Sequence, residues 1–423
     1  MKTTPFWTDE YTKPPNLQLS NLPEKVDVAI VGSGYTGLNA AITFAKTGVN
    51  VVVLEQETIG WGASSRNGSF VSPSLKAKWK TIEKNYGREQ AISFWKWALD
   101  SVNYVSNIIQ VESIDCDYQR TGMLGVATKP THFEDFQAYC DYLRETFGYD
   151  GARIIPRLDL HKEIGSSIYY GGMTSELGYR VHPAKYVYGL AEVATKCGAR
   201  LVEFAEVQQL RGNGNRLLLK TSKGDVLADQ VLLATGGYTT KLLRKARNGI
   251  FPVGSYMIVT EPLSKEMQSS ICPTGRLFYD SKIFLNYFGL TPDGRAFIGG
   301  RANLSPNLNL TTSGNLLHTR LVEIFPQLTD VDITHSWSGK LGVSFDQMPH
   351  IGHEKRVYYA YGYSGQGVST GSYMGVEVAE LMMGSRRDSA FMKIKHPQFF
   401  FASLDRFYLP IVSTYFKAMD RIF

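Results

Sequence analysis

The sequence has few cysteines and no long apolar segment. Its four cysteines, Cys116, Cys140, Cys197 and Cys272, form no CxxC pair, which argues against a disulfide framework and against a thiolate metal site. The eight histidines form no cluster with ligand spacing, so we expect no metal. No run of about 18 uncharged apolar residues is present, and the opening residues lack the apolar region of a signal peptide. We therefore expect a cytoplasmic protein.

Blocks of one charge are also missing. The formal net charge of +6 is spread along the chain without a run of Lys or Arg, which favours solubility over nucleic-acid binding. Apolar residues are plentiful, because 43% of the 423 residues are hydrophobic and 12% are aromatic. A chain of this kind can enclose a large core and more than one domain.

The order of apolar patterns predicts repeated alternation of strands and helices. We expect helices at 37–46, 83–110, 131–147, 184–197 and from about 366 to 383, and strands at 26–31, 50–55, 121–128, 200–228, 229–238, within 250–301 and at 357–367. Inserts separate the alternating blocks, which predicts a discontinuous cofactor domain and a second domain built from the inserts. The predicted ranges are 1–115, 165–240 and 335–423 for the cofactor domain, and 116–164 and 241–334 for the second.

The stretch GSGYTG, residues 32–37, lies between the first strand and the first helix. Gly32 permits a tight turn, Gly34 lets the backbone approach a pyrophosphate, and Gly37 lets helix and strand pack closely. Glu55 ends the next strand, where its carboxylate can accept the ribose hydroxyls. The motif occurs once, which favours a resident FAD that takes electrons directly from a substrate over a flavin reduced by a nicotinamide.

The Gly- and Ser-rich stretch IGWGASSRNGSF, residues 59–70, indicates a loop on a ligand. With it, the chain resembles the D-amino-acid oxidase and glycine oxidase superfamily of FAD enzymes, most closely the γ-glutamylputrescine oxidase-like branch. The matching segments are VDVAIVGSGYTGLNAA, VVVLE, GWGASSRNGS, LTPDGRAFIGGR, WSGKLGVSFDQMPHIG and YGYSGQG. The resemblance implies an α/β fold, in which an FAD-binding Rossmann-like domain of the glutathione-reductase type joins a second, antiparallel-sheet α+β substrate domain.

The resemblance also implies a set of cofactor-binding residues. These are Gly32, Ser33, Gly34, Tyr35, Thr36, Gly37, Glu55, Gln56, Gly62, Ala63, Ser64, Ser65, Arg66, Asn67, Gly68, Ser69, Val207, Thr235, Gly236, Trp337, Gly339, Gly365, Gln366, Gly367 and Val368. Val207 matches the position that meets adenine, although it can equally be a core valine. A helix that starts near Gln366 would direct its N-terminal dipole at the N1 and C2 edge of reduced flavin.

Three positions depart from the relatives. Gly339 stands where some relatives attach the flavin through a cysteine, so we expect noncovalent FAD. Ser369 replaces a carboxylate-binding lysine, and Gly289 replaces an arginine that is common in the branch. We therefore expect an alkylamine or a polyamine conjugate such as γ-glutamylputrescine as the substrate, unless Arg66 or Arg301 holds a carboxylate.

Amine oxidation by hydride transfer needs positioning and exclusion of water more than acid–base side chains. Aromatic walls are the expected signature. The candidates for substrate positioning are Phe70, Tyr256, Tyr287 and Tyr363, with Trp337 as a further wall, and Lys282 and Lys340 are candidates for a cation near flavin N5. For each aromatic residue a place in the core is the alternative, and for each lysine solvation at the surface.

Three functions stay open on the sequence. The first is an oxidase that releases an imine and returns electrons to oxygen as hydrogen peroxide. The second is an amino-acid oxidase or dehydrogenase of the same fold that passes electrons to a membrane quinone, and the third is a flavoprotein whose FAD is structural and which binds a partner. The aromatic tail, residues 396–423, would make a weak membrane-surface contact or, as we favour, dock on the protein itself. The oligomeric state is open.

Overall fold

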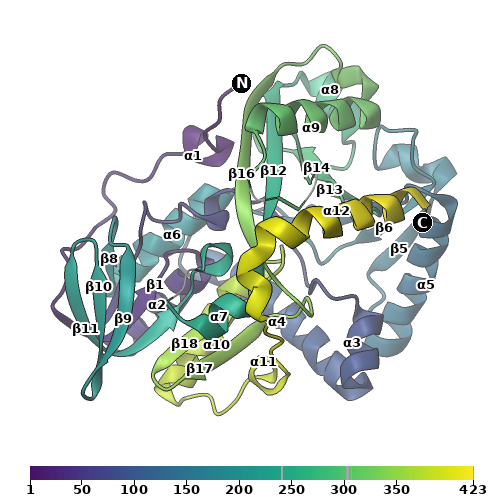
Figure 1. Ribbon diagram of the computed structural model, residues 1–423. Helices are drawn as coiled ribbons and strands as arrows, with labels where there is room; N and C mark the ends of the chain where they lie inside the picture. Colours follow the sequence, from purple (N-terminus) through teal and green to yellow (C-terminus); the bar gives the residue numbers. More distant parts are fainter. Residues whose placement is uncertain (240–241, 302–303, 306, 423) are drawn as a thin grey trace.

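The computed structural model describes residues 1–239, 242–301, 304–305 and 307–422. These residues form two large β-sheets with helices packed against them, and a helix-rich segment closes one side of the molecule (Figure 1). The C-terminal helix runs across the front of the view in Figure 1.

The first sheet is the one that the βαβ pattern predicts. In spatial order its strands are β17 (His350–Glu354), β18 (Val357–Tyr361), β11 (Gly224–Leu233), β1 (Lys25–Val31), β2 (Val51–Leu54) and β8 (Arg200–Val202), with β10 (Arg216–Thr221) and β9 (Val207–Asn213) branching from β11. Strand β1 pairs in parallel with β2 and β11, and β11 pairs in parallel with β18. Parallel strands of this kind present their carboxyl ends at one edge, where ligands bind in open α/β sheets.

Both faces of the first sheet are covered, which explains the continuous apolar run of β1. Val28 and Ile30 lie in the core cluster that includes helices α2 (Tyr35–Lys46), α4 (Arg88–Val111), α6 (Pro183–Lys196) and α10 (Ser369–Met383). Ala29 and Val31 belong to a separate cluster with residues of β9, β10 and β11. Successive side chains of a strand point to opposite faces, so one strand serves two cores.

The second sheet is almost entirely antiparallel. Its strands in order are β16 (Ile333–Ser344), β12 (Ile250–Pro262), β15 (Arg295–Gly300), β14 (Tyr287–Leu290), β13 (Leu277–Asp280), β4 (Met123–Val126), β6 (Gly171–Ser175) and β5 (Ala152–Pro156). Only the β13–β4 pair is parallel among the described neighbours. Helix α9 (Leu310–Ile324) packs on this sheet through residues such as Leu317 and Leu321. The predicted fold class is confirmed.

Most of the predicted elements form, with three informative differences. The helix predicted at 83–110 is two helices, α3 (Trp79–Tyr86) and α4, because Gly87 adopts a φ of +87° between them. Helix α10 begins at Ser369, later than predicted. The strand predicted at 229–238 begins earlier and ends at Leu233. The remaining elements are α1 (Phe6–Glu10), β3 (Phe70–Val71), α5 (Pro130–Phe147), β7 (Tyr179–Arg180), α7 (Arg244–Asn248), α8 (Lys265–Ile271), α11 (Ala390–Lys393) and α12 (Asp405–Ile422).

The division into two domains stays a prediction. Strands β6 and β16 lie in ranges that the sequence assigns to the cofactor domain, yet both pair within the second sheet. The chain passes between the two sheets as many times as the predicted ranges imply, but β6 and β16 show that two of the predicted boundaries are placed too early in the chain.

The aromatic tail folds back on the protein. Leu409 of α12 is buried in a cluster with Val253 of β12 and Val343 of β16, which agrees with docking on the chain's own surface. None of the helices in the described part of the chain is long and apolar enough to cross a membrane. A weak contact of this tail with a membrane surface stays a prediction.

The packing of α10 on α2 yields a stability prediction. A Cβ added to Gly375 would overlap the Thr36 carbonyl oxygen and lie 3.1 Å from the Ala40 nitrogen. We expect Gly375→Ala to lower the free energy of unfolding by about 1–3 kcal/mol, because the two helix backbones must separate. Urea unfolding of the purified protein measures this.

Gly212→Ala is the matched control. A Cβ at Gly212 meets no other heavy atom within 4 Å, so the expected change is within about 0.5 kcal/mol. Equal effects of the two substitutions would contradict the close packing of α2 and α10.

Candidate functional site

A cavity of about 510 Å³ opens at the carboxyl edge of the first sheet and extends toward the second sheet. The last residues of β1 and β2, Val31 and Leu54, line this cavity. Residues that follow β11 and β18, such as Thr235 and Tyr363, line it as well. Its volume falls in the usual range for small-molecule sites. The cavity lies where the fold predicts a dinucleotide.

The glycines of GSGYTG do what the spacing predicts. Gly32 has a φ of +103°, which side chains rarely adopt, and a Cβ on Gly37 would overlap the Gly32 carbonyl oxygen. A Cβ on Gly34, the N-cap of α2, would lie 2.9 Å from the Ser64 hydroxyl oxygen. Because these glycines lack side chains, α2 can begin directly beside the cavity. The unpaired N–H groups of its first turn and the positive end of its dipole then lie at the cavity.

Glu55 lines the cavity and holds the glycine turn. Its Oε2 accepts hydrogen bonds from the Ser33 nitrogen at 2.9 Å and the Ser33 hydroxyl at 2.7 Å, and its Oε1 accepts from the Glu57 nitrogen at 3.1 Å. A carboxylate has about four acceptor positions. One is left for a ribose hydroxyl, whereas the sequence predicted that Glu55 accepts both.

The loop 59–70 is tied to α2 by its own polar groups. The Ser64 hydroxyl accepts from the Tyr35 nitrogen at 3.0 Å, and the Tyr35 hydroxyl donates to the Ser64 carbonyl at 2.6 Å. Asn67 donates to the same carbonyl and accepts from the Ser69 nitrogen at 2.9 Å. Burial raises the pKa of Tyr35 well above its ordinary value, so its hydroxyl stays protonated and keeps donating.

The turn after β18 joins the two halves of the site. Positive φ angles at Gly362, Ser364 and Gly365 reverse the chain. Tyr363 accepts a hydrogen bond from the Thr36 hydroxyl at 2.8 Å, which links this turn to the start of α2. Gln366 lies in the turn before α10 and lines the cavity.

Most of the predicted cofactor residues share this cavity. Those that line it are Gly32, Ser33, Gly34, Tyr35, Thr36, Glu55, Gln56, Gly62, Ala63, Ser64, Arg66, Asn67, Gly68, Val207, Thr235, Gly236, Gly339, Gly365, Gln366, Gly367 and Val368. Gly37, Ser65, Ser69 and Trp337 support the lining from behind it. Ser69 donates to the Val181 carbonyl at 2.6 Å, and the Trp337 indole donates to the Arg66 carbonyl at 3.1 Å.

The predicted aromatic positions divide into two groups. Phe70, Tyr287 and Tyr363 line the cavity, and the rings of Phe70 and Tyr287 meet edge to face at 5.9 Å. Tyr256 is corrected, because it lies in the core of the second sheet and its hydroxyl bonds the backbone of Ser305 and Leu308. Its neighbour Ser255 lines the cavity instead, as the alternation of a strand requires.

The two lysines proposed near N5 differ in position. Lys340 lines the cavity, with its ammonium 5.8 Å from the ring centre of Tyr238. Lys282 is exposed and is not among the lining residues. No cysteine or histidine belongs to the described lining, which agrees with the expectation from Gly339 that FAD is noncovalent.

Sequence reasoning missed the far end of the cavity. Five aromatic side chains line it there, namely Trp79, Trp95, Tyr139, Tyr149 and Tyr279, and we call this group the aromatic compartment. It is built by α3, α4, α5, the residue after Gly148 and β13, which are distant in sequence. The sequence predicts a helix over 83–110, and nothing in that pattern singles out Trp95.

Besides Arg66 and Lys340, two further cations line the cavity, Lys76 and Arg301. Burial, together with the charges of Arg301 and Lys78, lowers the pKa of Lys76 to about 8. Burial also lowers the pKa of Arg301, partly offset by Tyr287. Lys76 alternates with Lys78 and Lys80 in the sequence, a pattern typical of an exposed segment, so nothing local marked it out.

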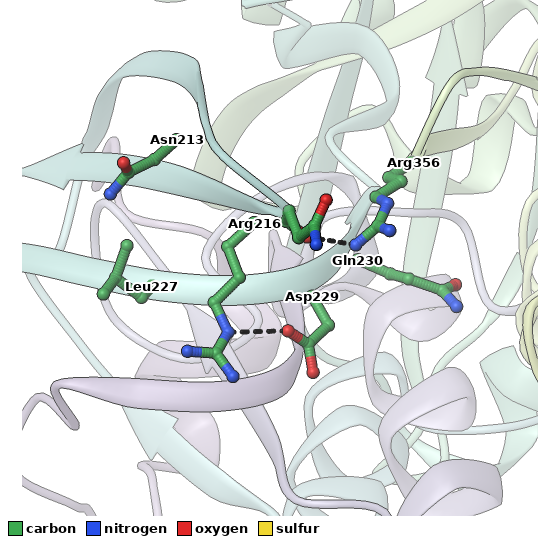
Figure 2. A pocket seen from close by; sticks show the side chains of 7 residues that line it. Asn213, Arg216, Leu227, Asp229, Gln230 and Arg356 are labelled. Carbon is green, nitrogen blue, oxygen red and sulfur yellow. Dashed lines mark hydrogen bonds and ion pairs between the residues drawn. The ribbon is translucent and has the colours of Figure 1, made fainter.

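A second hollow lies at the junction of β10, β11 and the turn before β18. Figure 2 shows its lining, in which Arg216 points at Asp229 with a nitrogen–oxygen distance of 2.8 Å. Arg356 donates to the Asn215 carbonyl there. Arg216 and Arg356 in this hollow already have partners within the protein. Unlike the main cavity, the hollow therefore gives no indication of a bound ligand.

The residues of the main cavity fit a flavin dinucleotide. The positive φ of Gly32 and the missing side chain of Gly34 leave the backbone open to a pyrophosphate at the start of α2. Glu55 offers a carboxylate oxygen to the ribose, and the cavity continues past Phe70 toward the second sheet. FAD would supply the redox chemistry, and these residues would hold it.

Known proteins agree with this geometry. A family model described as FAD dependent oxidoreductase (DAO) matches residues 27–381. The chain is 31% identical over 376 residues to Gamma-glutamylputrescine oxidoreductase of Escherichia coli, with 88% of this chain and 87% of that protein covered. It is 30% identical over 394 residues to the Haemophilus influenzae protein named "Probable oxidoreductase OrdL", with 92% and 89% covered.

The fold has relatives among solved structures. The crystal structure of glycine oxidase from Geobacillus kaustophilus superposes with a TM-score of 0.75 and covers 87% of this chain and 97% of its own, at 21% identity. That likeness shows the fold alone. Because the family model spans most of the chain and two relatives are at least 30% identical over most of it, the predicted resemblance is confirmed: the chain belongs to the DAO family of FAD-dependent oxidoreductases, and FAD is its cofactor.

Proposed function

We propose that this chain is an amine oxidase that acts on an alkylamine or a polyamine conjugate such as γ-glutamylputrescine. The amine C–N bond becomes an imine, which water hydrolyses, and the two electrons and two protons leave with oxygen as hydrogen peroxide. The observation that carries the proposal is one continuous cavity, which joins a dinucleotide-binding turn to the aromatic compartment. The name of the Escherichia coli relative supports the amine class.

The cofactor residues act by holding and orienting. When bound, FAD would supply the acceptor for a hydride from the substrate carbon and the route for the electrons to oxygen. In our proposal, the start of α2 and the loop 59–70 hold the pyrophosphate, Glu55 holds a ribose, and Gln366 lies beside the flavin ring. The hydrogen bond between Thr36 and Tyr363 keeps the two ends of this arrangement in register.

The side chains near the reacting carbon position the substrate and exclude water. Tyr287 is partly buried, its hydroxyl lies 2.9 Å from the Ser255 hydroxyl, and desolvation raises its pKa. Burial likewise raises the pKa of Tyr363. Both phenols are therefore neutral hydrogen-bond donors at neutral pH and do not act as bases. Aromatic faces attract an amine that enters as a cation, so the walls favour amines without requiring an acid–base pair.

The activity is tested by anaerobic reduction of the flavin. We expect alkylamines and polyamine conjugates to bleach the visible flavin band faster than glycine, sarcosine or D-alanine, because the small amino acids cannot fill the aromatic compartment. Stopped-flow absorbance with both panels at equal concentration measures this. Admission of oxygen should then restore the band and release one hydrogen peroxide per imine.

Two results would point away from this proposal. Turnover with an artificial dye but not with oxygen would favour a dehydrogenase that serves a quinone. A flavin that no amine bleaches would favour a structural FAD. A higher rate with an α-amino acid would contradict the proposed substrate class but not the amine chemistry.

The role of Glu55 is tested by Glu55→Gln. This change keeps size but removes the charge that strengthens the ribose hydrogen bond, so the FAD dissociation constant should rise by about tenfold or more. Fluorescence titration of the apoprotein with FAD measures it. Glu57→Gln is the control, because Glu57 lies two residues away and does not line the cavity. An unchanged constant in Glu55→Gln would remove Glu55 from the cofactor site.

A further inference from the structure

Lys76 and Arg301 are two cations that face one cavity without an anionic partner. Lys76 lies in the segment between β3 and α3, and Arg301 directly follows β15. Neither side chain makes an ion pair or a hydrogen bond with any residue that the structure describes. The groups whose charge reaches them are Arg301 and Lys78 for Lys76, and Tyr287 for Arg301. No carboxylate is among them.

This arrangement is unusual because cations removed from water are ordinarily paired. The half-buried Arg276 follows that rule. Arg276 lies 3.0 Å from Glu163 and 2.8 Å from Glu176, and Arg216 is paired in the second hollow (Figure 2). Two like charges in one cavity repel each other as well as lose hydration. An anion from outside the protein would relieve both penalties.

The position of the pair indicates which anion this is. The pyrophosphate-binding features, namely the start of α2 and the loop 59–70, belong to the first sheet's side of the cavity. Arg301 extends from the second sheet, and Lys76 lies between Phe70 and Trp79 in the chain, both of which line the cavity. The two cations therefore belong to the part of the lining that lies outside the pyrophosphate-binding features, which favours a substrate anion over the cofactor's own phosphates.

We propose that Lys76 and Arg301 bind a carboxylate of the substrate, so that the oxidised amine carries a carboxylate separated from its reacting nitrogen. This inference rests on the proposed amine oxidation and narrows its substrate class. Arginine presents a planar fork that matches a carboxylate, and lysine adds a point charge. The pair serves positioning and specificity rather than the hydride transfer itself.

Binding of carboxylates that cannot be oxidised tests the pair directly. Butanoate, titrated into the holoenzyme, should perturb the visible flavin spectrum, and butanamide should bind at least about tenfold more weakly. Lys76→Met and Arg301→Gln should each raise the butanoate dissociation constant by about tenfold or more. Lys78→Met is the matched control, because Lys78 is exposed and lies outside the lining, and its constant should stay within about twofold.

The pH dependence of butanoate binding provides a second arm. With the pKa of Lys76 at about 8, the lysine is charged below that pH and loses its charge above it. The butanoate dissociation constant should therefore be flat below about pH 8 and rise by up to about tenfold per unit above it. Arg301 and Lys78 are the charged groups that face Lys76. Lys76→Met should abolish the rise, and a rise that persists in this variant would overturn the role of Lys76.

Matched substrates separate this inference from the proposed function. We expect 5-aminopentanoate to reduce the flavin with a higher rate constant over affinity than pentylamine. Lys76→Met and Arg301→Gln should erase that preference, and Lys78→Met, which lies outside the lining, should keep it. If no amine reduces the flavin but butanoate binds through the two cations, the proposed function fails and the carboxylate site stands. If pentylamine reduces the flavin but butanoate binds equally to all variants, the carboxylate site fails alone.

Two further outcomes would overturn the assignment. Tighter binding of propylphosphonate than of butanoate would show a phosphate site instead. Loss of FAD from purified Lys76→Met and Arg301→Gln, with FAD retained in Lys78→Met, would show that the cations serve the cofactor.

Discussion

The close approach of α2 to its surroundings is the constraint on which the site depends. Its first turn packs so tightly that a Cβ on Gly37 would overlap the Gly32 carbonyl, and one on Gly375 of α10 would overlap the Thr36 carbonyl. This packing places the N-terminus of α2 at the carboxyl edge of the first sheet, beside the turn after β18. The hydrogen bond from Thr36 to Tyr363 then depends on it, and so does the shape of the cofactor end of the cavity.

The two ends of the cavity follow different physical rules. At the cofactor end, backbone geometry, helix dipoles and one carboxylate act together, and few side chains need to be specific. At the substrate end, side chains decide, because aromatic rings form much of the lining and Lys76 and Arg301 are partly buried there. Electrostatic interactions are stronger beside an apolar wall than in water. An unpaired cation there is therefore less stable, and its attraction for an anion is greater. Amine chemistry and carboxylate recognition are therefore compatible in one cavity if the two groups of the substrate are separated.

The departures from the relatives gain a physical meaning from this arrangement. Ser369 and Gly289 stand where relatives have a lysine and an arginine. Because both cationic anchors are missing, the sequence alone indicated a substrate without a carboxylate next to the reacting nitrogen. Lys76 and Arg301 supply positive charge from other elements. We therefore propose that the chain has moved its anion-binding charge rather than lost it, which would change how far the carboxylate lies from the reacting nitrogen.

The sequence alone determined the cofactor and the fold that carries it. A tight turn, a close helix approach and a carboxylate at a strand end are local requirements, so the residues from Gly32 to Gly37 and Glu55 could be read directly. The aromatic compartment could not, because it is assembled from side chains of α3, α4, α5, the residue after Gly148 and β13, whose local patterns indicate ordinary core or surface. Tyr256 shows the limit: it borders Ser255, but the strand turns it to the opposite face. Which aromatics form a wall, and which cations lack a partner, was decided only when the tertiary structure brought distant segments to one cavity.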